Sequence, residues 1–94
     1  MQKVYYVYII TNYKNSVLYI GVTSNLPKRI SQHKKGVSVS SFSKKYRLYK
    51  LVWFTVFDNP NDAIAFEKKV KGWRRERKLE LIRQTNPKFR DLNH

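Results

Sequence analysis

Apolar, β-branched and aromatic residues dominate two segments near the start of the chain. Residues 4–10 (VYYVYII) and 17–23 (VLYIGVT) suit a pleated, half-buried surface, which is typical of β-strands. The polar segment between them, Thr11–Ser16, favours a turn. The pattern therefore predicts an antiparallel hairpin. Residues 48–57 (LYKLVWFTVF) predict a third strand.

The segment after the hairpin predicts a helix and then a loop. Ser24 or Asn25 is a suitable N-cap for a helix over residues 26–35, and Gly36 ends it. Residues 37–46 carry small polar side chains without a helical period. This segment is therefore predicted to be a loop.

Two further helices are predicted after the third strand. Asp58 or Asn59 caps the first of them, which presents apolar residues at spacings of three and four. A last helix covers about residues 75–84 and stops before Asn86, and residues 88–94 are expected to form an extended tail. The predicted core stripe of the longer helix consists of Ala63, Phe66, Val70 and Trp73.

The element order β-β-α-β-α-α predicts a small α/β domain of the α+β kind. Its three-stranded, mainly antiparallel sheet is expected to be flanked by helices. A chain of 94 residues is the size of one domain, so residues 1–94 are assigned to a single domain. Because 41% of the residues are hydrophobic, a core is feasible and full disorder is excluded.

Charge adds a functional expectation. Twenty Lys and Arg against six Asp and Glu give a net charge of +14, which favours a polyanionic partner such as nucleic acid. The absence of cysteine excludes disulfides, thiol catalysis and thiolate zinc sites. No apolar run is long enough to span a membrane, so a cytoplasmic protein without a membrane partner is expected. The predicted phosphate-contacting residues are Lys44, Lys45, Lys71, Arg74 and Arg75.

The hairpin brings candidate chemistry onto one face. If Tyr8 pairs with Tyr19, both phenols and Gly21 point to the same side of the sheet, and the other side is largely apolar. These tyrosines are equally well explained as ordinary strand residues. A glycine inside a strand often marks a close approach, and we predict that Gly21 makes room for a bound substrate backbone.

Three more residues complete the candidate site. Arg29 and His33 are four residues apart and share a helix face, although a solvated basic helix would look the same. Glu67 lies beside the apolar stripe of its helix, where a carboxylate needs a cation. That cation is either a neighbouring Lys or Arg or a metal ion, and a single carboxylate holds Mg²⁺ only together with water and a substrate phosphate.

Together these pieces resemble the GIY-YIG nuclease superfamily, in particular its short stand-alone bacterial members. The matching elements are the two tyrosine triplets, then Arg29, His33 and Glu67, and the later stretches KGWRR (71–75) and NPKFRDL (86–92). The first triplet reads Tyr6-Val7-Tyr8, so a tyrosine stands where the family has glycine; the second reads Tyr19-Ile20-Gly21.

The resemblance implies a role for each matching residue. Tyr8 or Tyr19 orients or deprotonates the attacking water, and Tyr19 is favoured. Arg29 stabilises the phosphoryl transition state, and His33 contacts the substrate or carries a proton. Glu67 binds one Mg²⁺ or Mn²⁺ ion. Asn86 is the candidate for the family's late asparagine, which we predict to contact substrate.

The implied function is a metal-dependent endonuclease that hydrolyses phosphodiester bonds in DNA, with structured or repair and recombination substrates expected. Cations near a phenol favour its ionised form, which would help a tyrosine act as a base. Two alternatives stay open at this stage. One is a catalytically weak nucleic-acid-binding module of the same fold, and the other is a basic accessory protein that contacts structured RNA or another protein.

Overall fold

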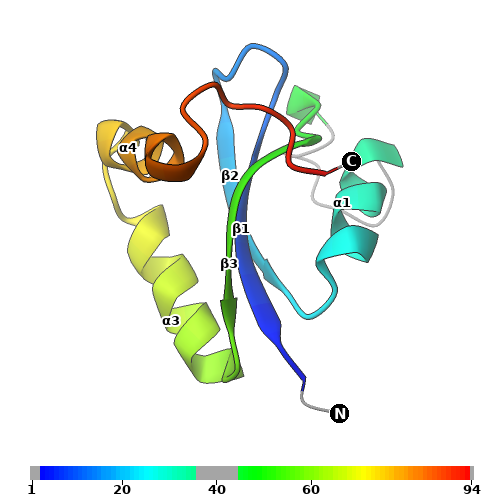
Figure 1. Cartoon of the computed structure of the whole chain (residues 1–94), viewed down its shortest axis with the longest axis vertical. Helices are drawn as coiled ribbons and strands as arrows, with labels where there is room; N and C mark the ends of the chain where they lie inside the picture. Colours follow the sequence, from blue (N-terminus) through cyan, green and yellow to red (C-terminus); the bar gives the residue numbers. More distant parts are fainter. Residues whose placement is uncertain (1–2, 36–44, 94) are drawn as a thin grey trace.

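A computed structural model describes residues 3–35 and 45–93. In these residues a three-stranded sheet lies between one helix on one side and two helices on the other (Figure 1). The predicted element order β-β-α-β-α-α and the α+β class are confirmed. The elements are β1 (Tyr5–Thr11), β2 (Leu18–Thr23), α1 (Leu26–Lys35), β3 (Lys50–Phe57), α3 (Pro60–Lys71) and α4 (Arg75–Thr85).

The first strand lies at the centre of the sheet. The strand order is β2-β1-β3, and β1 pairs antiparallel with both neighbours. β1 is therefore flanked by two edge strands, and helices pack against both of its faces. The apolar run of β1 is consistent with this position, because Val7, Tyr8, Ile9 and Ile10 are all buried.

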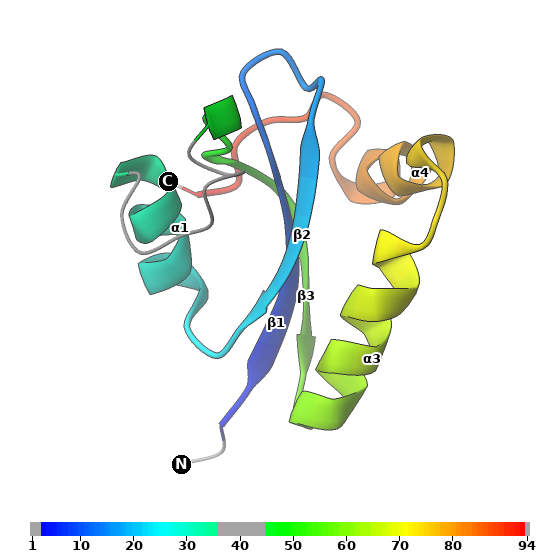
Figure 2. The ribbon, with the colours of Figure 1, turned by 180° about the vertical axis from the view of Figure 1, so that it is seen from behind.

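Each face of the sheet has its own hydrophobic core. On one face, Tyr8 and Ile10 of β1 pack with Leu26 and Ile30 of α1. On the other face, the core joins β1 to α3 and α4; it includes Val7, Ile9, Ala63, Val70 and Ile82. The view from behind shows the same division, with α1 on one side of the strands and α3 and α4 on the other (Figure 2).

The hairpin register differs from the predicted one by two residues. Tyr8 pairs with Gly21, and Tyr19 pairs with Ile10. The reason is a turn displaced by one residue, to residues 12–17, in which the Asn12 side-chain oxygen accepts hydrogen bonds from the backbone N–H groups of Ser16 (2.8 Å) and Val17 (3.3 Å). A shift of two residues keeps every side chain on its predicted face. The predicted grouping of Tyr8, Tyr19 and Gly21 on one face therefore holds.

Local capping chemistry fixes the helix starts. Asn25 caps α1 by accepting from the N–H of Lys28 (3.2 Å), and Asn59 caps α3 by accepting from the N–H of Asn61 (2.8 Å). These are two of the four residues proposed as caps. Gly36 and residues 37–44 of the predicted loop lie outside the described residues, and residues 45–46 are helical, so the loop prediction is wrong for these two residues.

The end of the chain is folded onto the sheet and is not a simple extended tail. Phe89 is buried, and the N–H of Leu92 donates to the carbonyl of Leu51 in β3 (2.8 Å). Asp91 accepts hydrogen bonds from the Leu51 N–H (3.2 Å) and from Lys34 Nζ of α1 (2.9 Å). The segment crosses from α4 to α1 over one end of the sheet (Figure 1) and ties the two sides together.

Asn86 anchors this crossing. Its side chain is buried, and its Nδ2 donates to the carbonyls of Val52 (3.0 Å) and Arg90 (2.8 Å). Its Oδ1 accepts from the Arg90 N–H (3.0 Å). All the hydrogen-bonding capacity that a buried amide requires is thus used within the protein.

We expect Asn86→Ala to lower the free energy of unfolding by about 2–4 kcal/mol, because it leaves buried backbone groups without partners. Urea unfolding measures the change. Gln84→Ala, an exposed position near the end of α4, is the control and is expected to cost at most about 0.5 kcal/mol. Equal losses for the two variants would contradict the anchoring role.

Candidate active site

A pocket of about 180 Å³ collects most of the residues singled out from the sequence. We call it the tyrosine pocket. β1 contributes Tyr8, β2 contributes Tyr19 and Gly21, α1 contributes Arg29 and His33, and α3 contributes Glu67. Its full lining is Tyr8, Tyr19, Gly21, Val22, Arg29, His33 and Glu67. Residues up to 59 positions apart in the sequence therefore meet around one small volume.

The pocket lies at the β2 edge of the sheet. Its lining includes residues of α1 on one face and of α3 on the other, and no described residue of β3 takes part. Only an edge strand lets groups from both faces meet in this way. Glu67 of α3 thus reaches the same space as Tyr8, although the Tyr8 side chain packs on the α1 face of the sheet and α3 covers the other face.

Tyr8 and His33 form the buried centre of the pocket. Tyr8 Oη and His33 Nε2 are 3.1 Å apart in a hydrogen bond that joins β1 to α1. The exposed fractions of these two residues are 2% and 6%. The Tyr19 ring packs against both, with centroid distances of 6.4 Å to Tyr8 and 5.7 Å to His33. The three rings hold one another in place.

Burial decides the protonation of this centre. Desolvation raises the pKa of Tyr8 well above its ordinary value; Tyr19 and Glu67 raise it further, and Arg29 opposes them. Burial, followed by the positive charge of Arg29, lowers the pKa of His33 to about 4. At neutral pH Tyr8 is therefore a protonated phenol and His33 a neutral imidazole. The expectation that nearby cations would favour an ionised phenol is wrong for Tyr8, because desolvation outweighs them.

Gly21 is explained by its partner across the strands. A Cβ atom at this position would lie 2.5 Å from both Cζ and Oη of Tyr8, so only glycine leaves room for the phenol in this position. The predicted use of this space by a substrate backbone stays a prediction. The structure explains the glycine by the ring of Tyr8, which occupies the space that a side chain at position 21 would need.

Glu67 is paired with a lysine and still belongs to the pocket. Lys71 Nζ lies 3.0 Å from Glu67 Oε2, one helical turn away. The carboxylate side chain is only 13% exposed, whereas that of Lys71 is 51% exposed. The lysine is therefore the partner with room to move, and the carboxylate stays at the pocket wall.

The other predicted phosphate contacts lie apart from the tyrosine pocket. Arg75 Nη2 donates to the carbonyl of Asn15 in the hairpin turn (3.0 Å). Arg74 lines a separate hollow beside α4, and Lys45 extends over the ring of Tyr46 (5.5 Å). Lys44 lies outside the described residues. Contact of these side chains with nucleic acid stays a prediction.

Asn86 requires a correction. It was expected to contact substrate, but it is buried beneath the C-terminal segment and does not line the tyrosine pocket. Its amide is occupied by Val52 and Arg90. We therefore assign it a structural role.

Two features of the site were not predicted from the sequence. Val22 follows Gly21 in β2 and so belongs to the other, largely apolar face, yet it lines the pocket because β2 is an edge strand. The particular partner of Glu67 was left open, although the spacing of Glu67 and Lys71 is the usual one for a helical ion pair. The spacing of Glu67 and Lys71 could have predicted the ion pair. The position of Val22 could not be predicted without the strand order.

This combination of a small α+β domain with two phenols, an arginine and one glutamate at a sheet edge is that of a nuclease-type domain. The chain matches the family model of the GIY-YIG catalytic domain over residues 4–80. It therefore belongs to the GIY-YIG family, a nuclease superfamily whose substrates are nucleic acids and whose members typically depend on a divalent metal ion.

Small bacterial relatives share most of its length. A UPF0213 protein of Clostridium perfringens is 39% identical over 77 residues, which cover 82% of this chain and 81% of the relative. A UPF0213 protein of Syntrophus aciditrophicus is 35% identical over 82 residues, or 87% and 92% of the two chains. The solution NMR structure of a UPF0213 protein of Bacillus halodurans is 25% identical, with a TM-score of 0.58 over 94% of this chain and 92% of that one.

The residues present fit a divalent ion held by one carboxylate. The described residues contain no group of three or more His, Cys, Asp or Glu side chains suited to a metal. Mg²⁺ is, however, commonly held by one or two carboxylates, with water and substrate phosphate completing its coordination. Glu67 and the space of the tyrosine pocket meet that requirement.

No helix in the described part of the chain is both long and apolar enough to cross a membrane.

We expect Gly21→Ala to destabilise the protein by about 1–3 kcal/mol, because the new methyl group displaces the Tyr8 ring. A double-mutant cycle with Tyr8→Ala, measured by urea unfolding, tests the cause. In the Tyr8→Ala background the cost of Gly21→Ala should fall to less than half. An equal cost in both backgrounds would show that the ring is not the obstacle.

The stability of the fold should depend on pH through His33. Its pKa is about 4 in the folded state against 6.5 ordinarily, so between these values the unfolded chain binds a proton that the folded chain does not. The free energy of unfolding is therefore highest above pH 6.5 and should fall by roughly 1–3 kcal/mol as the pH drops toward 4.

Thermal unfolding between pH 4 and pH 7.5 measures this effect. Wild type is compared with His33→Gln, which removes the imidazole and keeps the charged and titratable residues that line the same pocket, namely Tyr8, Tyr19, Arg29 and Glu67. The variant should show a shallower pH dependence over this range. Parallel curves for the two proteins would rule out His33 as the source.

Proposed function

We propose that this protein is a metal-dependent endonuclease that hydrolyses phosphodiester bonds in DNA at the tyrosine pocket. The observation that carries the proposal is the convergence of Tyr8, Tyr19, Arg29, His33 and Glu67 on one small space at the sheet edge. The net charge of +14 supports a polyanionic substrate.

Each side chain has a task in the proposed reaction. The oxygen of a water molecule forms a bond to phosphorus, and the bond from phosphorus to one sugar oxygen breaks. Tyr19, the more accessible phenol, orients the water. Tyr8 takes a proton from this water while passing its own to Nε2 of His33, which is neutral and already 3.1 Å away. The departing sugar oxygen takes a proton from solvent, and His33 releases the proton it received to solvent, because burial disfavours its charged form.

Arg29 and Glu67 supply charge on either side of the reacting phosphate. The Arg29 guanidinium would stabilise the negative charge that grows on the phosphoryl oxygens, and its position in the pocket lining supports this role. Glu67 would hold the divalent ion, whose chemistry is to offset charge on phosphate and leaving oxygens. Lys71 would have to leave the carboxylate, and its exposed side chain allows this movement.

We expect the protein to nick supercoiled plasmid in the presence of Mg²⁺ or Mn²⁺, and Glu67→Gln to lower the rate at least 100-fold. The matched control is Glu76→Gln, which removes a helical carboxylate outside the tyrosine pocket and should keep the wild-type rate. Tyr8→Phe should lower the rate by about 10²–10⁴, since it breaks the path for the proton.

Equal nicking by wild type and Glu67→Gln would refute the proposed function. Binding to DNA is then measured in the same proteins at several salt concentrations. Salt-sensitive binding without metal-dependent cutting would identify a nucleic-acid-binding module instead.

A further inference from the structure

A second hollow adjoins the tyrosine pocket at the start of α1. It measures about 330 Å³, and we call it the cationic hollow. Arg29 lines both spaces, so the two hollows meet at this residue. The lining consists of Thr23, Ser24, Asn25, Lys28, Arg29 and Gln32.

The chemistry of this lining suits an anion. It offers two cationic side chains, hydroxyl groups and amides, and it contains no carboxylate. The tyrosine pocket, in contrast, includes Glu67, and the hollow beside α4 includes Glu76 and Glu80. An anion in the cationic hollow would therefore meet hydrogen-bond donors and positive charge without facing an acidic side chain.

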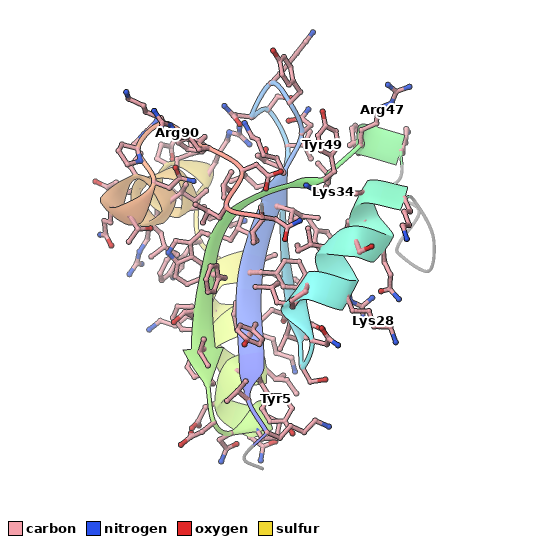
Figure 3. All side chains as sticks on the ribbon, turned by 45° about the vertical axis from the view of Figure 1, so that its right-hand side comes forward. Tyr5, Lys28, Lys34, Arg47, Tyr49 and Arg90 are labelled. Atoms are coloured by element: carbon pink, nitrogen blue, oxygen red, sulfur yellow. The ribbon has the colours of Figure 1, made fainter. Side chains whose placement is uncertain are left out.

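Lys28 is available for such a ligand. Within the described residues it forms no ion pair, whereas Lys34 pairs with Asp91 and Lys71 with Glu67. Figure 3 shows Lys28 and Lys34 near opposite ends of α1, and only Lys34 lies beside the C-terminal segment. The first-turn amide of Lys28 is already capped by Asn25, so the attraction comes from side chains and not from the helix end.

We propose that the cationic hollow binds the phosphate next to the one that is cut. This inference rests on the proposed function and adds a second contact to the same strand. Successive phosphates are covalently linked neighbours, and Arg29 stands between the two spaces that would receive them. The substrate unit is then a stretch of strand with at least two phosphates, held by Lys28 and Gln32 in addition to the tyrosine pocket.

Binding of short thymidine ligands tests the proposal without any cleavage. The ligands are dTpdT, with one phosphate, and the same dinucleotide carrying a second phosphate at its 5′ or its 3′ end. Affinities are measured by NMR titration in EDTA, which removes divalent ions. The proteins are wild type, Lys28→Gln, and the charge-matched control Lys35→Gln, which changes an exposed lysine of α1 outside the cationic hollow.

Wild type should bind at least one of the two-phosphate ligands about tenfold more tightly than dTpdT, because charge-assisted hydrogen bonds are of this strength. Lys28→Gln should lose most of that advantage, and Lys35→Gln should keep it. The side-chain amide signal of Gln32 should shift only with the two-phosphate ligands. No preference in wild type, or equal losses in the two lysine variants, would overturn the proposal.

The outcome is separable from that of the nuclease assay. Preference for the second phosphate that depends on Lys28 supports the cationic hollow even if no variant cuts DNA. Metal-dependent cutting together with an unchanged preference in Lys28→Gln would keep the proposed function and refute this subsite. A thermal unfolding curve of each variant confirms that the folded proteins are being compared.

Discussion

The site depends on how the Tyr8 ring is held. Its phenol lies over Gly21 in the space that a side chain would fill, and its hydroxyl is bonded to His33. This one ring joins the central strand, the edge strand and the first helix, and it buries two polar groups that satisfy each other. Arg29 and Tyr19 are placed by the same elements. A change that moves the ring is therefore expected to alter the positions of the neighbouring site residues as well as the chemistry of the site.

An edge strand makes the remaining part of the site possible. Since β2 has a neighbour on one side only, the helices on the two faces can contribute to a common space. Glu67 enters from the side opposite to Arg29 and His33. In this way a small domain with few acidic residues can bring one carboxylate to a strongly basic surface. There the carboxylate and a substrate phosphate would both coordinate a divalent ion.

Much of this arrangement was predictable from the sequence, because local signals set it. Strand composition, Asn caps and the spacing of apolar residues predicted the elements and their order, and the triplets with Arg29, His33 and Glu67 predicted every lining residue of the tyrosine pocket except Val22. Non-local packing set the rest. The pairing of Tyr8 with Gly21 followed from the side chain of Asn12, and the burial of Asn86 followed from the folded C-terminal segment. The raised pKa of Tyr8 followed from burial, and burial cannot be predicted by counting the charged residues near it in the sequence.

The proposed function requires that Glu67 brings a divalent ion to the tyrosine pocket when a phosphodiester is present. Paramagnetic broadening by Mn²⁺ in NMR spectra, with a hydrolysis-resistant phosphorothioate oligonucleotide bound, measures where the ion sits. We expect selective loss of the backbone amide signals of Tyr8, Gly21 and Glu67, and no such loss in Glu67→Ala. Broadening centred on Glu76 and Glu80 of α4, unchanged in that variant, would contradict it.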